Sequence, residues 1–308
     1  MTKKISKDKI KTWFVTGASS GIGHEMCKQL LEKGYNVIAV ARRIPDFTHE
    51  NALCLSVDVT KPETIHNAVN LGIEKFGKID VLVNNAGILS SSTIEDETLD
   101  HMKQLMEVNF FGTFNTMNAL IPHFRANKNG TIINNTSKSG ISPRRFGAAY
   151  CSSKHAIEGL TGVCYRECKR FIRTMAFELG WFAASGIKPD SKTQLKNIPE
   201  IYRGLNDIDV KVKEKFTNDL PIAVSLIINE IEKEKIPRRF ILGRDSLAFA
   251  LSELNLFNKD YKHSVKVGKP CSPIKKQPSK IFSISNEGKN NNKHKVIIIL
   301  GIKLKFKI

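Results

Sequence analysis

Three side chains that could move a proton lie close together in the stretch NNTSKSGISPRRFGAAYCSSK. Ser137 carries a hydroxyl, Tyr150 a phenol and Lys154 an amine, and the last two are four residues apart. On a helix, residues at this spacing lie on one face, about one turn from each other. A phenol with a pKa of about 10 is a poor base at neutral pH, but a neighbouring ammonium favours the phenolate. The three residues therefore predict general acid–base chemistry on a substrate oxygen.

Taken alone, the Tyr150–Lys154 pair has a simpler explanation. Most tyrosines and lysines at this spacing belong to an exposed helix surface. The functional interpretation depends on whether other parts of the chain place a cofactor and a substrate beside the pair.

The hydrophobic pattern up to about Asp260 predicts the elements that would hold such a site. Short β-branched runs alternate with amphipathic segments, as in strands joined by crossover helices in a parallel sheet. Because such crossovers are right-handed, we expect an α/β fold: a Rossmann-type doubly wound parallel sheet of about seven strands in a three-layer αβα sandwich. The predicted strands are Thr12–Gly17, Asn36–Ala41, Ala52–Val57, Asp80–Asn85, Gly130–Asn135, Ile172–Phe177 and Arg238–Gly243.

The helix after the third strand is predicted to begin with a capping box. Thr60 is the expected N-cap, Pro62 lies in the first turn, and Glu63 follows three residues past the cap.

A glycine-rich turn follows the first predicted strand and opens a helix. Gly17, Gly21 and Gly23 in TGASSGIG allow a sharp turn and the close approach of a pyrophosphate, whose charge is met by amides at the helix N-terminus. Loops also use glycine for geometry alone, but a position between a strand and a helix favours dinucleotide binding.

Together with three further motifs, this turn resembles that of the classical short-chain dehydrogenase/reductase family. The spacing GxxxGxG is that family's form of the fingerprint, and the chain also has NNAG at Asn84–Gly87, DVT at Asp58–Thr60 and VNFFG around Asn109. The resemblance extends over roughly Lys11 to Asp260. It implies these cofactor-binding residues: Gly17, Ser19, Ser20, Gly21, Ile22, Gly23, Arg42, Arg43, Asp58, Val59, Asn85, Ala86, Gly87, Tyr150, Lys154 and Gly180.

The resemblance also implies a role for each residue of the proton-transfer group. In the family the serine positions the carbonyl or alcohol, the tyrosine transfers the proton, the lysine also holds the nicotinamide ribose, and the asparagine supports a water relay. These roles fall on Ser137, Tyr150, Lys154 and Asn109. The resemblance thus implies an oxidoreductase that interconverts a small-molecule carbonyl and a secondary alcohol, with Tyr150 as general acid/base. Like many members, it would form a homo-oligomer, a dimer or tetramer.

The end of the second predicted strand indicates which nicotinamide cofactor binds. An acidic residue there would accept hydrogen bonds from the ribose 2′-hydroxyl, whereas an arginine would pair with a 2′-phosphate. The sequence has Arg42 and Arg43 and no acid at that point. NADP is therefore expected in preference to NAD, unless both arginines are only exposed surface charges. Ser20, before the second glycine of the turn, is not basic and adds no support.

Departures from the family pattern leave an alternative open. Phe171 stands directly before the sixth predicted strand, where resembling enzymes usually have a glycine, and Leu179 precedes Gly180 where they carry proline. Residues 183–185, which read AAS, replace the family's carboxamide-binding threonine. The alternative is a protein on the same fold that binds a dinucleotide but has weak or no activity.

No motif identifies the substrate. Trp181, Phe182 and Tyr202, in the segment expected to cover the substrate, could line an apolar pocket or only pack that segment. Arg144 and Arg145 could attract an anionic substrate or be loop charges that face solvent.

The basic charge of the chain is concentrated at its ends. Of the formal net charge of +18, the first twelve residues contribute five lysines and one aspartate, and the last 48 contribute twelve lysines and one glutamate. We interpret these ends first as solvated tails, so nucleic-acid binding is not expected of the folded domain. Association of the lysine-rich tails with nucleic acid stays open as an alternative that could coexist with either function. The predicted organisation is a basic N-terminal extension (1–11), a NAD(P)-binding oxidoreductase domain (12–260) and a basic, disordered tail (261–308) whose final Val296–Ile308 alternates like an edge strand.

The remaining composition is ordinary for a soluble globular protein, with 41% hydrophobic and 25% charged residues. The six cysteines form no CxxC pair, which favours a reducing cytoplasm. No stretch is apolar enough for a signal peptide or a membrane span. Cys164 and Cys168 share a helix face without other ligand candidates, so we assign them to packing and expect no metal.

Overall fold

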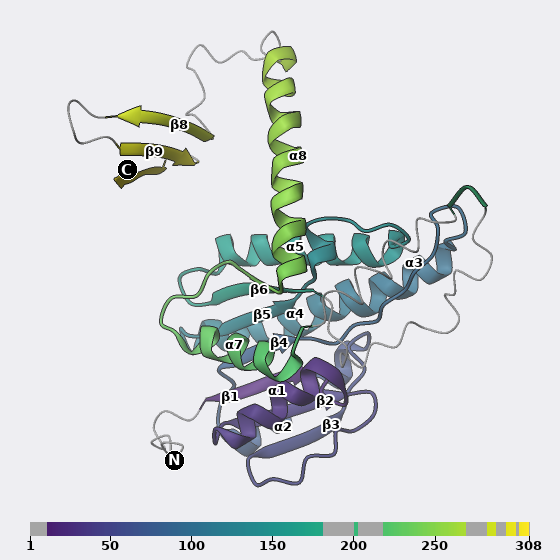
Figure 1. Ribbon diagram of the computed structural model, residues 1–308. Helices are drawn as coiled ribbons and strands as arrows, with labels where there is room; N and C mark the ends of the chain where they lie inside the picture. The colour runs from purple at the N-terminus through teal and green to yellow at the C-terminus, as the bar shows by residue number, and fades with distance from the viewer. Residues whose placement is uncertain are drawn as a thin grey trace. The chain divides into compact units, whose positions relative to one another are not determined.

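The computed structural model of the chain describes residues 11–180, 200–202, 218–268, 282–287, 294–299 and 302–307 (Figure 1). The chain divides into two compact units, Met1–Leu254 and Asn255–Ile308. All of the predicted catalytic and cofactor-binding residues belong to the larger unit.

The larger unit is built on a seven-stranded sheet with the strand order β3-β2-β1-β4-β5-β6-β7, in which every pair is parallel. The direction of strand addition reverses at β1, and ligands of doubly wound sheets bind at the carboxyl ends of the strands beside such a reversal. The predicted α/β fold is confirmed. The strands are β1 (Thr12–Thr16), β2 (Asn36–Ala41), β3 (Ala52–Ser56), β4 (Val81–Asn84), β5 (Thr131–Asn135), β6 (Arg173–Leu179) and β7 (Arg239–Leu242).

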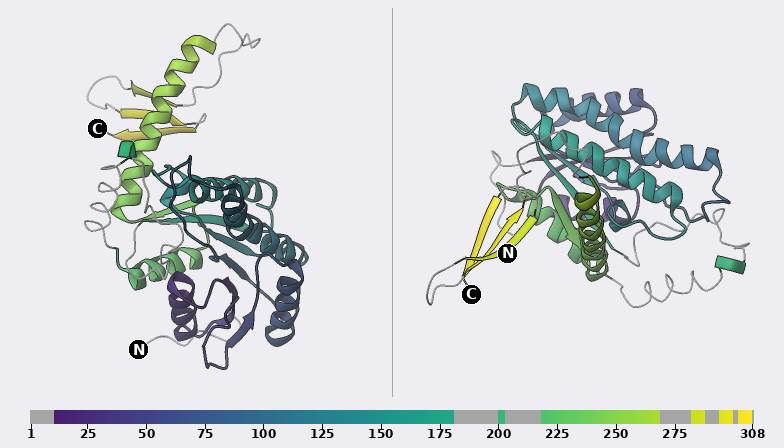
Figure 2. Two further views of the ribbon diagram at one scale, coloured as in Figure 1. Left: turned by 90° about the vertical axis from the view of Figure 1, so that its right-hand side faces the viewer. Right: turned by 90° about the horizontal axis from the view of Figure 1, so that it is seen from above.

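Helices cover both faces of this sheet (Figures 1 and 2). One face packs against α1 (Gly21–Glu32) and α7 (Leu220–Glu232), and the other against α2 (Pro62–Phe76), α4 (Gly112–Ala126) and α5 (Ala148–Glu167). The arrangement is the expected three-layer sandwich. The shorter elements of the larger unit are α3 (Leu99–Leu105), a π-helical turn (Met106–Phe111) and 3₁₀ turns at Lys138–Gly140 and Glu200–Tyr202.

The central strand β1 supplies side chains to both halves of the core. Successive side chains of a strand point to opposite faces. Trp13 and Val15 accordingly belong to the cluster beneath α1 and α7, and Phe14 belongs to the cluster on the other face. All five residues of β1 are buried, so the turn that follows it starts from a rigid position.

The predicted capping box of α2 is wrong. The helix begins at Pro62, its N-cap is Lys61, and no side chain caps it. The Thr60 hydroxyl instead donates to Asp58 Oδ1 at 2.8 Å, and the Thr60 amide donates to the same oxygen at 3.0 Å. A threonine hydroxyl can form a hydrogen bond with a neighbouring side chain as well as with a helix end. Here it donates to the carboxylate of Asp58, two residues upstream.

The sixth strand ends later than the sequence predicts. It runs to Leu179 rather than Phe177, and Leu179 pairs with Leu242 of β7. Glu178 therefore lies inside a central strand and is fully buried.

The C-terminal part also differs from the prediction. Helix α8 (Arg244–Gly268) continues past Tyr261, where the disordered tail was expected to begin. Leu, Ala and Lys favour helix over this range, and the next proline is Pro270. In the described parts beyond it, β8 (Phe282–Glu287), β9 (His294–Ile299) and β10 (Ile302–Lys307) form an antiparallel sheet in the order β10-β9-β8. No helix in the described ranges is long and apolar enough to cross a membrane.

Candidate active site

The glycine turn folds tightly against the start of α1. Gly17 and Gly21 have φ angles of 68° and 58°, which favour glycine. A Cβ on Gly23 would collide with the Gly17 carbonyl oxygen. The N-cap residue Ser20 makes no side-chain cap bond, and the first turn of α1 contains no acidic residue. The first backbone amides of the helix therefore remain available to bind an anion. A pyrophosphate is an anion of the kind that such helix ends bind.

Hydrogen bonds join the glycine turn to the ends of β4 and β5. Thr16 Oγ1 accepts from the backbone amides of Asn85 and Ala86, both at 2.9 Å. The Asn85 side chain donates to the carbonyl of Thr16 at 3.1 Å and accepts from Asn135 Nδ2 at 2.9 Å. The predicted cofactor residues Asn85, Ala86 and Gly17 are thus brought together at one edge of the sheet.

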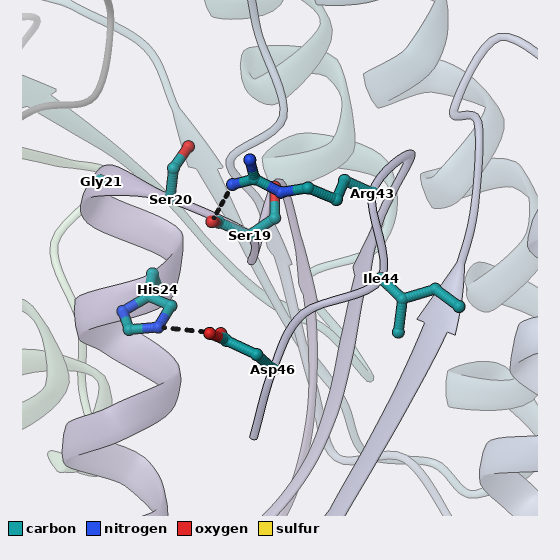
Figure 3. A pocket seen from close by; sticks show the side chains of 7 residues that line it. All are labelled: Ser19, Ser20, Gly21, His24, Arg43, Ile44 and Asp46. Atoms are coloured by element: carbon teal, nitrogen blue, oxygen red, sulfur yellow. Dashed lines mark hydrogen bonds and ion pairs between the residues drawn. The ribbon is translucent and has the colours of Figure 1, made fainter. Parts of the chain in front are cut away.

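A cavity of about 550 Å³ lies beside the first turn of α1 (Figure 3). Arg43 donates to the Ser19 carbonyl at 2.9 Å, which holds its guanidinium across the cavity, and His24 Nε2 lies 3.5 Å from Asp46 Oδ1. The cavity contains Arg43 but not Arg42. The sequence did not single out His24, Ile44 and Asp46 as site residues, although His24 directly follows the glycine motif. The lining residues are Ser19, Ser20, Gly21, His24, Arg43, Ile44 and Asp46.

Asp58 lies near the end of β3 with the positive charge of Arg42 close by. Its burial opposes ionisation, but hydrogen bonds from Thr60 and the charges of Arg42 and Lys61 outweigh it and lower the pKa of the carboxyl. The next residue, Val59, is buried and its carbonyl accepts from Asn115 Nδ2 at 3.0 Å. Both predicted residues thus follow β3 at the edge of the sheet where β1 and β4 end.

Tyr150 and Ser137 lie together and are both only 8% exposed. Ser137 precedes a 3₁₀ turn, and its oxygen accepts from the Ser139 amide at 3.1 Å. Burial raises the pKa of the Tyr150 phenol, whereas hydrogen bonding with Ser137 and the charge of Arg144 act to lower it. The Ser137 hydroxyl therefore lies within hydrogen-bonding reach of the Tyr150 phenol.

Lys154 lies one helical turn after Tyr150, with its Nζ 5.7 Å from the centroid of the phenol ring. It donates to the Asn135 carbonyl at 2.8 Å. Burial lowers the pKa of Lys154 to about 8, against the opposing effect of Glu158. An amine with that pKa is still mostly protonated at neutral pH, so a positive charge stands beside the phenol.

Asn109 lies in the π-helical turn and is fully buried. Its Oδ1 accepts from the Ile88 amide at 2.8 Å, and its Nδ2 donates to the Ile88 carbonyl and to Ser153 Oγ, both at 3.0 Å. A Cβ on Gly87 would lie 3.2 Å from Asn109 Oδ1 and 3.8 Å from Lys154 Nζ. Asn109 therefore links the NNAG segment to α5. π-Helical turns are frequent at functional sites.

Gly180, at the end of β6, packs against the start of α8. A Cβ there would collide with the carboxylate of Asp245, which also lies 3.2 Å from Lys138 Nζ. The residues that follow Gly180, including Trp181, Phe182, Ala183, Ala184 and Ser185, lie outside the described residues. Tyr202 is described, and its ring packs edge to face on Phe146 with centroids 6.4 Å apart.

Two buried carboxylates beyond Lys154 were missed by sequence reasoning. Arg239 Nε lies 2.8 Å from Glu158 Oε2 and 3.3 Å from Glu178 Oε1. Burial, together with the negative charge of Glu158, raises the pKa of Glu178 to about 8, although Arg239 opposes the shift. The available signal was a glutamate inside the apolar run TMAFEL.

The two cysteines that were assigned to packing are both buried. Cys164 lies on α5, and Cys168 is the C-cap residue of that helix. Cys164 Sγ lies 3.5 Å from Thr174 Oγ1. Among the residues that the structure describes, no group of three or more His, Cys, Asp or Glu side chains could hold a metal ion.

Comparison with known proteins identifies the family. The family model for short chain dehydrogenases matches residues 11–195 of this chain. An uncharacterised oxidoreductase of Staphylococcus saprophyticus is 35% identical over 251 residues, which cover 78% of this chain and 97% of that protein. The chain belongs to the short-chain dehydrogenase family and is an oxidoreductase by that membership.

Solved structures agree with this assignment. A short-chain dehydrogenase from Streptomyces avermitilis matches with a TM-score of 0.76 and 27% identity, covering 86% of this chain and 100% of that one. The 3-ketoacyl-(acyl-carrier-protein) reductase of Brucella melitensis, complexed with NADH, matches with a TM-score of 0.51 and 30% identity over 55% of this chain and 74% of that one.

Proposed function

We propose that the chain is an NADP(H)-dependent oxidoreductase that interconverts a carbonyl and a secondary alcohol, with Tyr150 as general acid/base. The observation that supports this most is the buried group of Tyr150, Ser137 and Lys154, joined to the glycine turn by hydrogen bonds. Lys154 donates to Asn135, Asn135 to Asn85, and Asn85 to the carbonyl of Gly17 at 3.4 Å. Proton transfer and dinucleotide binding thus share one framework.

Each residue of the group has a separate task in this proposal. A bound nicotinamide dinucleotide supplies the hydride acceptor or donor. Tyr150 gives a proton to the carbonyl oxygen in reduction and removes one from the alcohol in oxidation. Ser137 accepts from the Ser139 amide, so its own hydrogen can be donated to the substrate oxygen. The charge of Lys154 favours the phenolate of Tyr150.

Asn109 has a supporting task. Its side chain is engaged with Ile88 and Ser153, so it holds the walls of the site in place. We propose that Asn109 also supports a water relay, as the family resemblance implies. Lys154 is likewise proposed to hold the nicotinamide ribose.

The preference for NADP rests on the cavity in Figure 3. Arg43 lines it, no acid directly ends β2, and the next acid along the chain, Asp46, lies beside His24. A guanidinium there can pair with a 2′-phosphate. The Brucella relative was solved with NADH, so the affinities for NADPH and NADH must be compared.

A second candidate is a dinucleotide-binding protein with little activity. The observation that favours it is the strand pairing of Leu179 with Leu242, at the position where related enzymes carry proline. The Gly180 amide also donates to the Leu242 carbonyl at 3.2 Å. The path of the chain into the nicotinamide end of the site can therefore differ from that of active relatives.

Binding and turnover measurements test the proposal. We expect NADPH to bind at least about tenfold more tightly than NADH, and Arg43→Ala to remove most of that difference, because one charge-assisted bond to phosphate is lost. Affinities come from fluorescence titration with each cofactor, and turnover from NADPH oxidation against a panel of ketones and aldehydes. Arg125→Ala, an exposed arginine on α4, is the control.

Two outcomes would contradict the proposal. Equal affinities that Arg43→Ala leaves unchanged would reject the NADP preference. Tight NADPH binding without oxidation of the cofactor by any substrate would favour the second candidate.

Homo-oligomerisation and a cytoplasmic location are also proposed. Apolar side chains on and beside α4 and α5 are exposed, namely Phe111, Phe114, Val163 and Tyr165. Exposed apolar groups on neighbouring helices suit an interface between identical chains. The cysteines that the structure describes are free thiols, which suits a reducing compartment.

A further inference from the structure

Arg144 joins the loop before α5 to the loop after β4. Its Nη2 donates to the Ser90 carbonyl at 2.7 Å and to Ser91 Oγ at 3.0 Å, and its Nη1 donates to the Arg145 carbonyl at 3.2 Å. The same two loops meet where the Ser92 amide donates to the Phe146 carbonyl at 3.0 Å. The planar guanidinium presents several donors in a fixed geometry, so one side chain fastens both loops.

The same guanidinium stands near the ring of Tyr150. Arg144 Cζ lies 5.8 Å from the ring centroid, and Lys154 Nζ lies 5.7 Å from it. The phenol therefore has two cations at nearly equal distance, only one of which belongs to the motif that predicted the site. Arg145, the next residue, is exposed to solvent.

We propose that Arg144 is a positioning residue for Tyr150: it fixes the loop that leads into α5 and holds a second positive charge over the phenol ring. The proposal rests on the function proposed for Tyr150. The three hydrogen bonds of the guanidinium go to two carbonyls and a hydroxyl, so they hold the side chain beside the phenol without neutralising its charge.

The two cations differ in how they respond to pH. The pKa of Lys154 is lowered to about 8, so this amine loses its charge in mildly alkaline solution. An arginine stays charged at any pH that a folded protein survives. Arg144 therefore keeps a positive charge near Tyr150 where Lys154 no longer does. Among the residues that the structure describes, Cys151 also acts on the phenol, and Glu158 lies one turn beyond Lys154.

The test compares Arg144→Met, Arg144→Lys and the control Arg145→Met in the full chain. The ionisation of Tyr150 is followed by NMR of ¹³C-labelled tyrosine, with its signal assigned by its absence in Tyr150→Phe. We expect Arg144→Met to move the onset of ionisation upward by about one pH unit, because a cation near the phenol is removed. Arg144→Lys retains most of the effect, and Arg145→Met leaves ionisation unchanged.

Turnover gives a second, independent measurement. In the direction of alcohol oxidation, we expect Arg144→Met to shift the pH–rate profile upward by the same amount and to lower kcat about tenfold at neutral pH. KM for the substrate should change little, because Arg144 does not contact it in the proposed arrangement.

Several outcomes would overturn the proposal. Unchanged ionisation of Tyr150 in a folded Arg144→Met chain would show that Arg144 only fastens the loops. An identical effect of Arg145→Met would show a general surface-charge effect. If Arg144→Met does not fold, a shift of ionisation in Arg144→Lys as large as one pH unit would show that geometry, not charge, matters. Turnover that survives Tyr150→Phe would reject the proposed function itself, which is a separate result.

Discussion

Replacing Tyr150 by Phe should lower kcat for carbonyl reduction by about 10³-fold, within the range expected when a general acid is removed, and leave the Kd for NADPH within about twofold. The substitution removes only the hydroxyl. The ring packs against Leu105 and Ala149, and phenylalanine retains those contacts. The chain should therefore fold normally and bind cofactor while losing its proton donor.

The matched control is Tyr165→Phe, which removes a hydroxyl from a 42% exposed tyrosine on the same helix. We expect it to have wild-type turnover. The measurement is NADPH oxidation at saturating substrate, with cofactor binding determined separately by fluorescence. Loss of NADPH binding in Tyr150→Phe, or turnover equal to that of the control, would contradict the role proposed for Tyr150.

Glu178→Gln is expected to stabilise the chain in alkaline solution. Glu158 and Glu178 both lie against the guanidinium of Arg239. The positive charges of Arg239 and Arg238 do not outweigh the burial of Glu178 and the negative charge of Glu158, so ionisation of Glu178 is unfavourable in the fold. Because the folded chain raises the pKa of Glu178 from 4.5 to about 8, it favours the protonated carboxyl. This contribution to stability is complete below about pH 4.5 and is lost as the pH rises through about 8.

The size of the effect follows from the shift. Each pKa unit corresponds to about 1.4 kcal/mol, so a shift from 4.5 to about 8 costs up to about 5 kcal/mol once the carboxyl is ionised. Glutamine is neutral at every pH and avoids this cost. Glu178→Gln should therefore raise the free energy of unfolding above pH 8 and flatten its decline between pH 5 and pH 9.

Urea denaturation at several pH values measures this effect. Glu74→Gln, an exposed carboxylate on α2, should follow the wild-type profile. A Glu178→Gln chain less stable than the wild type at pH 9 would show instead that the carboxylate, paired with Arg239, is the form the fold prefers.

Much of the site could be predicted from the sequence because its residues act through local spacing. Tyr150 and Lys154 are placed by the repeat of one helix, and the turn with Gly17 and Gly23 is placed by the strand and helix on either side of it. Such relations depend on neighbours in the chain, and the structure places all four residues at the carboxyl edge of the sheet.

Residues whose partners are distant in the chain could not be predicted. Arg144 bonds to Ser90, 54 residues earlier, and Arg239 reaches Glu158, 81 residues earlier. Nothing in the sequence around Arg144 separates it from Arg145, although one is bound within the protein and the other faces solvent. The failed cap at Thr60 has a related cause, since local patterns do not show which of two acceptors a hydroxyl will choose.

The packing of α1 against α7 has a consequence for how the chain is made. Gln29 of α1 donates to the Pro221 carbonyl, and Lys33 pairs with Glu232, about 190 to 200 residues later in the chain. The buried face of α1, including Leu30, is covered partly by side chains of α7 such as Ile228. A growing polypeptide on the ribosome therefore displays this apolar helix until most of the chain has emerged. The helix that follows the dinucleotide turn can be packed fully only after α7 has emerged, so nascent chains should depend on chaperones for longer than their early completion of β1 and β2 would suggest.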